Sequence, residues 1–235
     1  MSNTHRLYHF VCDDFGFQNI QNRRLKLSFP DQVNDLFEFM PFDFGKEDEG
    51  RRRRLFWQTA RAEYSKTQGF ISFSKHWSVP TMWAHYANNH GGICLGFDLP
   101  QSLDIGVPYA KVDYEETLMP LDSKVEDDHT YKDEMVHYAS KTKSQHWQYE
   151  NEWRYWFSLS PSEIKQKAAD PNKLFFADFG DDLVLKDVIL GHRSKLSSNC
   201  LKELLKSTDK VKFTTARPSF REFKMVSQLE PRHQK

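Results

Sequence analysis

The sequence predicts a single α+β domain over residues 1–235, with a mixed, largely antiparallel sheet and flanking helices. Strand-like and helix-like segments are interspersed along the chain, and no internal repeat is present. Two neighbouring strand-like segments, residues 70–74 and 92–97, are joined by a connection that is short for a parallel crossover, which favours antiparallel pairing. A chain of 235 residues with 38% hydrophobic content can bury one substantial core.

The periodicity of apolar residues predicts each element in turn. Strands are expected at residues 7–11, 25–29, 70–74, 92–97, 107–114, 152–159, 174–177, 184–190, 211–214 and 220–226. Helices are expected at residues 13–22, 47–68, 130–145 and 195–206. Asp13 or Asp14 is expected to cap the first helix. In the second helix, Leu55, Thr59 and Ala62, with Phe56 and Ala60 beside them, are expected to form the apolar face. The acidic segment 121–129 is expected to be a mobile loop.

Composition narrows the class of protein. The 33 basic residues balance the 33 acidic ones, which argues against strong nonspecific binding to nucleic acid. Four consecutive arginines, residues 51–54, predict a modest patch that faces a partner or nucleic acid and takes no part in chemistry. The first residues form no apolar signal segment, and no apolar run approaches the ~20 residues of a membrane span. We therefore expect a soluble cytoplasmic protein without membrane contact.

The three cysteines predict neither a disulfide framework nor a metal site. Cys12, Cys94 and Cys200 are widely spaced and form no CxxC pair. The spacing of His85, His90 and Cys94 lacks a further acidic or cysteine ligand, so no metal is expected.

Residues 69–98 form the first candidate binding region. They place two apolar strand-like runs around a short turn that is rich in aromatic and polar side chains. Trp83, His85 and Tyr86 combine flat faces with polar tips, which suits a small planar ligand. In the blander alternative these aromatic residues are core residues with satisfied polar tips.

Alternating carboxylates and aromatics form the second candidate region, residues 147–154. If this region is a strand, Glu150 and Glu152 point to one face and meet the turn of residues 83–86 at a single cleft. Two adjacent carboxylates tend to raise the pKa of one of them, so that one handles a proton while the other stays charged. The alternative is a structural ion-pair network with Arg154.

Several ordered motifs carry a family resemblance. They are Asn34-Asp35-x-Phe37-Glu38, Ile71-Ser72-Phe73-Ser74, Met82-Trp83-Ala84-His85-Tyr86-Ala87, His90-Gly91-Gly92-Ile93-Cys94-Leu95-Gly96-Phe97-Asp98 and Trp147-x-Tyr149-Glu150-x-Glu152-Trp153-Arg154. Over roughly residues 6–195 the chain resembles a widespread bacterial family catalogued as a domain of unknown function. It also resembles, more weakly, the ADP-ribosyltransferase folds, in which successive strands offer His or Arg, then Ser or Tyr, then a catalytic Glu.

The resemblance to ADP-ribosyltransferases implies a fold of that type, with NAD as substrate. It assigns catalysis to Glu152 and Glu150, because a carboxylate next to the ribose stabilises the oxocarbenium-like transition state. It makes His9, Ser74, Trp83, His85 and Tyr86 the candidate NAD-binding residues. In this reading His9 or Ser74 holds a ribose hydroxyl, and Trp83 or Tyr86 stacks on the nicotinamide ring.

The same resemblance implies a toxin or phage-defence effector that modifies a protein or nucleic-acid acceptor. An antitoxin or other regulatory protein is then a candidate partner. The competing interpretation is a noncatalytic module in which the same residues bind a nucleotide or a partner protein. His9 also has a blander reading, as a strand histidine bonded to a backbone carbonyl.

Overall fold

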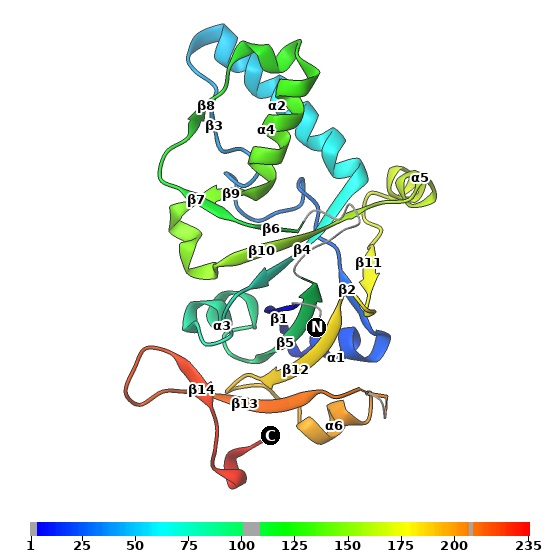
Figure 1. Cartoon of the computed structure of the whole chain (residues 1–235), viewed down its shortest axis with the longest axis vertical. Coiled ribbons are helices and arrows are strands. Elements are labelled where there is room, and N and C mark those ends of the chain that lie inside the picture. The colour runs from blue at the N-terminus through cyan, green and yellow to red at the C-terminus, as the bar shows by residue number, and fades with distance from the viewer. Residues whose placement is uncertain (1–3, 101–108, 207–208) are drawn as a thin grey trace.

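A curled, eight-stranded sheet is the centre of the part of the chain that the structure describes (Figure 1). This computed structural model describes residues 4–100, 109–206 and 209–235, without the side chain of residue 109. The strands lie in the order β14 (Met225–Ser227), β13 (Lys212–Pro218), β12 (Val184–Leu190), β5 (Gly92–Pro100), β1 (Thr4–Cys12), β4 (Gln68–Ser74), β10 (Glu152–Ser158) and β6 (Tyr109–Lys111). Strands β12 and β13 are parallel, and the other pairings described in this sheet are antiparallel. The α+β class and the mixed, largely antiparallel sheet are thereby confirmed. The expected antiparallel pairing of residues 70–74 with 92–97 was wrong, because β4 and β5 lie on opposite sides of β1, each antiparallel to it.

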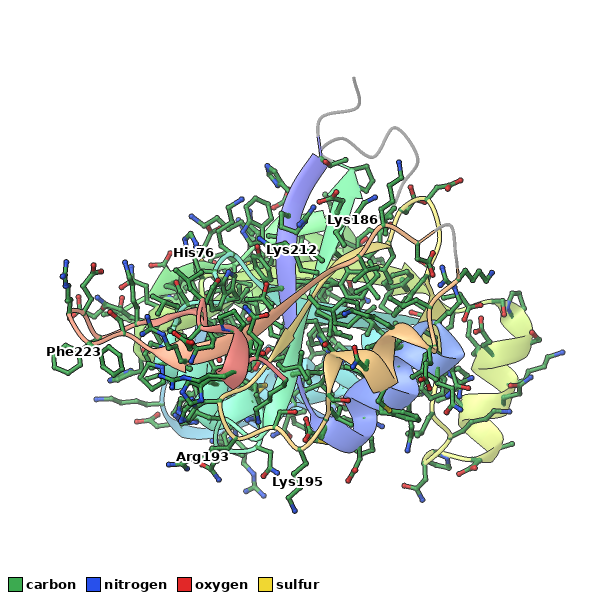
Figure 2. The ribbon with its side chains drawn as sticks, turned by 90° about the horizontal axis from the view of Figure 1, so that it is seen from below. His76, Lys186, Arg193, Lys195, Lys212 and Phe223 are labelled. Carbon is green, nitrogen blue, oxygen red and sulfur yellow. The ribbon has the colours of Figure 1, made fainter. Side chains whose placement is uncertain are left out.

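Helices and three small two-stranded sheets surround this sheet. The α-helices are α1 (Asp13–Asn22), α2 (Glu47–Thr67), α3 (Pro80–Tyr86), α4 (His129–Lys141), α5 (Pro161–Ala169) and α6 (Ser198–Lys202), and the short 3-10 helices are η1 (Ser123–Glu126), η2 (Gln145–Glu150) and η3 (Pro231–His233). The small sheets pair β2 (Arg24–Lys26) with β11 (Phe176–Asp178), β3 (Phe42–Asp43) with β8 (Met119–Pro120), and β7 (Asp113–Glu115) with β9 (Thr142–Ser144). Figure 2 shows the end of the molecule at which β13 and α6 lie. None of the helices described is long and apolar enough to cross a membrane.

The main core lies on one face of the central sheet. Leu7, Ile71, Leu95 and Val188 come from four of its strands and are at most 1% exposed. A separate cluster lies where α2 and α4 pack together at the top of Figure 1. There the rings of Phe42 and Trp57 meet edge to face, with centroids 4.7 Å apart.

Two predictions about the α2–α4 region were wrong. Leu55 is 65% exposed, and Thr59 and Ala62 are exposed too, because α2 turns inward the face that carries the large indole ring of Trp57. Ala60, which was expected on the apolar face, is buried, and Phe56 is half-buried. The segment 121–129 is not a simple loop: it contains η1, and both Leu121 and Val125 are buried.

Other expected elements change their limits. Strand β14 begins only at Met225, so most of the expected strand 220–226 is a loop, and α6 is much shorter than residues 195–206. The expected strand 107–114 is divided into β6 and β7, and residues 107 and 108 lie outside the described part. Asp13 does not cap α1; its carboxylate accepts hydrogen bonds from the Ser194 hydroxyl and the Lys195 amide, both at 2.7 Å.

The run of arginines has a structural part as well as a surface part. Arg53 is half-buried and donates to the carbonyl oxygen of Phe44 at 3.1 Å. Arg52 is paired with Glu126 of η1 at 3.1 Å. Two of the four arginines therefore connect α2 to its neighbours. The sequence had predicted only a surface patch facing a partner or nucleic acid.

Gly92 lies opposite Cys12 at the start of β5, in close contact with β1, and it generates a test of the fold. A Cβ at this position would stand 2.1 Å from the Val11 carbonyl oxygen and 2.9 Å from the Cys12 Cα. Both are backbone atoms of the paired strand, so the strands would have to separate. We expect Gly92→Ala to lower the free energy of unfolding by about 1–3 kcal/mol or more, measured by urea denaturation.

Gly180→Ala is the matched control, because a Cβ at Gly180 meets no heavy atom within 4 Å. It should change the free energy of unfolding by no more than about 0.5 kcal/mol. Equal losses in the two variants would contradict the close approach of β1 and β5.

Candidate functional site

A cleft of about 310 Å³ opens beside β1, β4 and α3, at the lower end of the ~300–1,000 Å³ typical of small-molecule sites. It is lined by Tyr8, His9, Phe10, Lys26, Ser28, Gln32, Val33, Asn34, Glu38, Phe70, Ile71, Ser72, Phe73, Ser74, Met82, Tyr86, Lys143, Glu150 and Glu152. The cleft therefore has an apolar wall and a wall of charged groups.

Three neighbouring strands bring a histidine, a serine and a glutamate to this cleft. Strand β4 pairs on one side with β1 and on the other with β10, so that Ser74 stands opposite both Tyr8 and Glu152. The imidazole Nδ1 of His9 lies 3.0 Å from the Ser72 carbonyl oxygen. The Ser72 hydroxyl donates to Glu152 Oε1 at 2.6 Å. The three residues are thus connected across β1, β4 and β10.

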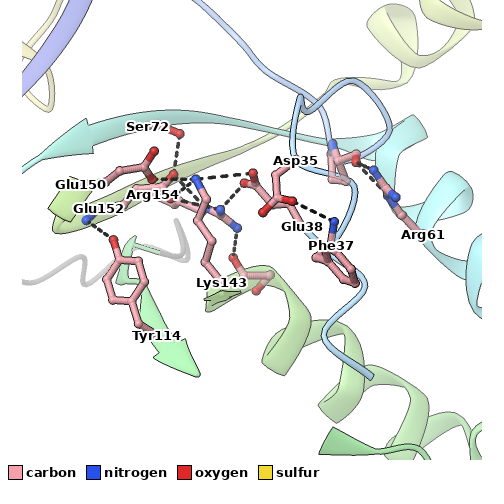
Figure 3. Close-up of polar contacts among 12 residues, drawn as sticks. Asp35, Phe37, Glu38, Arg61, Ser72, Tyr114, Lys143, Glu150, Glu152 and Arg154 are labelled. Atoms are coloured by element: carbon pink, nitrogen blue, oxygen red, sulfur yellow. Dashed lines mark hydrogen bonds and ion pairs between the residues drawn. The ribbon is translucent and has the colours of Figure 1, made fainter. Parts of the chain in front are cut away.

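A buried charge cluster forms the polar wall (Figure 3). It consists of Glu38, Lys143, Glu150, Glu152 and Arg154, each at most 6% exposed. Arg154 is fully buried; its Nε donates to Glu152 Oε1 at 3.0 Å, and its Nη2 donates to Glu38. Because Arg154 also donates to the Ser140 carbonyl oxygen at 2.9 Å, all three guanidinium nitrogens have partners.

Lys143 contacts every carboxylate of the cluster. Its Nζ lies 2.6 Å from Glu150, 3.5 Å from Glu152 and 3.6 Å from Glu38. Three carboxylates then face two cations, which leaves one negative charge in excess when all are ionised. Since an uncompensated buried charge is costly, the cluster favours one bound proton.

The surroundings of the two candidate catalytic carboxyls shift their pKa values in opposite directions. Burial alone would raise the pKa of Glu152, but Arg154 and Lys143 outweigh it and hold this pKa at about 2. Burial, with the nearby charge of Glu152, instead raises the pKa of Glu150 above its usual value. Burial likewise raises the pKa of Glu38, although Arg154 opposes the shift. Glu152 therefore stays ionised, while Glu150 and Glu38 are the places where a proton binds.

Tyr86, at the end of α3, faces Glu150. Its hydroxyl donates to Glu150 Oε1. Burial and the Glu150 charge raise the pKa of Tyr86 far above its usual value, so the hydroxyl keeps its proton. This contact confirms, for Tyr86, the prediction that the aromatic turn and the glutamates meet at one cleft.

Two of the other expected ligand-binding residues also lie in the cleft wall. Ser74 is buried, and its hydroxyl donates to the Glu150 carbonyl oxygen at 2.6 Å. Burial lowers the pKa of His9, which favours a neutral imidazole. Its contact with the Ser72 carbonyl is the backbone bond that the blander reading of His9 anticipated, and its ring still lines the cleft.

The remaining two do not line the cleft. Trp83 is 0% exposed, its Nε1 donates to the Trp77 carbonyl oxygen at 2.6 Å, and its ring meets Phe10 edge to face. The ligand-stacking role expected of Trp83 therefore does not fit the structure. His85 is exposed and lies against Tyr149, with ring centroids 6.0 Å apart.

The backbone conformation around Glu150 and Glu152 differs from the one that the sequence predicted. Glu150 ends η2, Asn151 adopts a left-handed conformation with φ of 44°, and Glu152 opens β10. The strand expected from residue 152 matches β10, and the condition that Glu150 shares a strand with Glu152 is not met, although Lys143 contacts both carboxylates. Sequence reasoning missed Lys143, which was expected in an ordinary helix but lies in β9.

Arg154 generates a test of the cluster. Arg154→Met removes the partner of two buried carboxylates, and such a loss typically costs about 3–5 kcal/mol. We expect a drop of this size in the free energy of unfolding, measured by chemical denaturation. Arg54→Met, at an exposed position of α2, is the control and should change stability by about 0.5 kcal/mol or less. A drop below about 1 kcal/mol for Arg154→Met would show that the pairs stabilise little.

Acid titration tests the ionised state of Glu152. Its pKa is about 2 in the folded protein against 4.5 as the reference value. A lowered pKa contributes stability above pH 4.5 and loses it as the pH falls towards 2, on the order of 3 kcal/mol in total. The raised pKa values of Glu38 and Glu150 act in the opposite sense, losing stability as the pH rises above 4.5.

We therefore expect the stability of Glu152→Gln to fall less steeply than that of the wild type between pH 4.5 and 2. Thermal midpoints measured across this range check the difference. Glu116→Gln, at an exposed position, should follow the wild-type curve. Parallel curves for wild type and Glu152→Gln would mean that the ion pairs do not depress this pKa.

Comparison with known proteins adds a partial family match. No curated protein and no solved structure matches the chain. A family model matches residues 82–155, which is a shorter segment than the expected resemblance over residues 6–195 but includes Tyr86, Lys143, Glu150, Glu152 and Arg154. This family is described as "Protein of unknown function (DUF2971)".

Proposed function

We propose that the cleft binds NAD and cleaves its nicotinamide–ribose bond, as an ADP-ribosyltransferase-like enzyme does. The observation that carries this proposal is the connection of His9, Ser72 and Glu152 across three adjacent strands that line one cleft. This is the strand order in which the resembling enzymes offer their histidine, their serine or tyrosine, and their glutamate. An ADP-ribosyltransferase-like fold is part of the same proposal.

Glu152 is suited to stabilise the transition state. When the glycosidic C–N bond breaks, its electron pair leaves with nicotinamide and positive charge develops on the ribose. A carboxylate that is already ionised and fixed in position lowers the energy of that cation without reorganising. Glu152 meets this requirement, because Arg154, Lys143 and Ser72 keep it charged and hold both of its oxygens.

Glu150 is suited to handle a proton. Its raised pKa makes it a stronger base than an ordinary carboxylate when it is ionised, and Tyr86 orients its Oε1. In the second half of the reaction an acceptor oxygen forms the new bond to ribose and gives its proton to Glu150. Two carboxyls whose pKa values are pushed apart are typical of an acid–base pair.

The remaining cleft residues are suited to hold the substrate. The His9 imidazole and the Ser74 hydroxyl are candidates for hydrogen bonds to ribose, and the Tyr86 ring is the candidate for contact with nicotinamide. A volume of about 310 Å³ accommodates the nucleoside end of a dinucleotide, with the rest of NAD outside it.

The biological role that follows is a toxin or phage-defence effector acting in the cytoplasm. The acceptor is a protein, a nucleic acid or water. A regulatory partner of the antitoxin type would keep such an activity in check.

A noncatalytic binding module is the second candidate. The observation that favours it is the full engagement of Glu152, whose oxygens already accept from Ser72, Arg154 and Lys143. This is the ion-pair network that sequence reasoning kept as its structural alternative. Such a module would bind a nucleotide or a partner without turnover.

Release of nicotinamide from NAD by the purified protein tests the proposal. We expect Glu152→Gln to lower kcat about 100-fold with little change in KM, because an interaction made mainly in the transition state is lost. Glu150→Gln should slow transfer to the acceptor. Tyr86→Phe, which leaves the charges in place, should have a smaller effect on the same step.

Thermal midpoints of all three variants separate catalysis from stability, and Glu116→Gln is the matched surface control. If Glu150→Gln and Glu152→Gln both stay folded and leave NAD consumption unchanged, the transferase proposal fails. Binding of NAD without cleavage by the wild type would favour the binding module.

A further inference from the structure

The loop between β13 and β14 exposes two phenylalanines to solvent. Phe220 is 90% exposed and Phe223 is 105% exposed. Figure 2 shows Phe223 projecting from this loop at the edge of the molecule. Neighbouring apolar rings exposed to this degree are typical of an interaction site.

The loop is held in shape by its own hydrogen bonds. The Ser219 amide donates to the Lys224 carbonyl oxygen at 2.9 Å, and the Arg221 amide donates to the Ser219 hydroxyl oxygen at 3.2 Å. At its base Met225 is 2% exposed, and the Met225 amide donates to the Ser78 carbonyl oxygen at 2.8 Å. The two rings are therefore presented by an organised loop, which lowers the entropy lost on binding.

Cations alternate with the two rings. The Arg217 guanidinium lies 4.9 Å from the centre of the Phe220 ring, and Arg221 stands between the two phenylalanines in the sequence. Lys224 is paired with Glu222 at 2.6 Å. Residues 217–224 thus carry three basic side chains and one acidic one, a net charge of about +2 at neutral pH. Flat rings interleaved with positive charge are the pattern by which proteins bind single-stranded nucleic acid.

The loop is joined to the same helix that forms a wall of the cleft. Ala216 and Met225 pack in one cluster with Met82 and Trp83 of α3, and Met82 also lines the cleft. In Figure 1, α3 and the β13–β14 loop lie on the same side of the molecule. A strand bound by the loop would therefore lie on the side of the molecule that carries α3.

We propose that the β13–β14 loop binds single-stranded nucleic acid, with Phe220 and Phe223 stacked on bases and Arg217 and Arg221 on phosphates. The role of that strand as ADP-ribose acceptor rests on the proposed function, but its binding does not. Insertion into lipid is less favourable, because burying Phe220 and Phe223 would carry Arg221 towards the hydrocarbon.

Fluorescence anisotropy with labelled oligothymidylate and oligouridylate, in the absence of NAD, tests the inference. We expect Phe220→Ala and Phe223→Ala each to weaken binding about tenfold, the loss typical of one stacked base. Arg221→Gln should reduce the slope of log K against log salt by about 0.7. Phe15→Ala, at a ring 62% exposed on α1, and Arg54→Gln are the matched controls and should bind as the wild type does.

Three results would overturn the inference. They are no binding at low salt, unchanged binding by the Phe220→Ala/Phe223→Ala double variant, or equal losses in the controls, which would place the site elsewhere. Binding to anionic lipid vesicles that is lost in the double variant, with oligonucleotides unbound, would identify a lipid surface instead.

Nicotinamide release measured without nucleic acid keeps the two proposals apart. The double variant should retain this release. Nucleic-acid binding by a wild type that cleaves no NAD would leave the loop's binding role standing and remove the transferase proposal. Cleavage of NAD by a wild type that binds no oligonucleotide would leave the transferase proposal standing and remove the binding role of the loop.

Discussion

The burial of the Arg154 guanidinium is the constraint on which the cleft depends. A cation with no exposed surface is tolerable only when its hydrogen bonds are satisfied and its charge is neutralised. Glu152, Glu38 and the Ser140 carbonyl meet these requirements, and they come from β10, from the segment before β3 and from α4. One side chain therefore joins the sheet to the α2–α4 region and fixes the positions of Glu38 and Glu152, while Lys143 and Tyr86 hold Glu150.

The same buried charges affect both the stability of the protein and its proposed reaction. Replacing a buried ionic cluster by apolar residues is often neutral or stabilising, so its presence is not explained by stability alone. Three carboxylates and two cations favour the binding of one proton, which the carboxylates share. These carboxylates line an open cleft. Under our functional proposal, the buried cluster is kept despite its energetic cost because it holds a charged Glu152 next to a protonatable Glu150.

Local pattern predicted much of the fold and part of the site. The apolar runs of β1, β4, β5, β10 and β12 were recognisable because each strand contributes several buried side chains. The inward face of α2 was predicted only in part, with Ala60 buried but Leu55 exposed, since spacing alone does not tell which of two faces meets a partner. Lys143 gave no sequence signal, because a lysine in a polar segment resembles any solvated one until the fold surrounds it with carboxylates.

The pairing of Glu38 with Arg154 spans 116 residues of sequence. Contacts of such separation form late, because the entropy of closing a long loop must be overcome before the contact contributes anything. A ribosome-bound chain that has emerged only as far as α4 still lacks η2 and β10, and with them Glu150, Glu152 and Arg154. We therefore expect the cleft to form late, and a chain that ends at α4 would contain His9, Ser72 and Tyr86 but none of the charged groups that surround Glu152 in β9, η2 and β10.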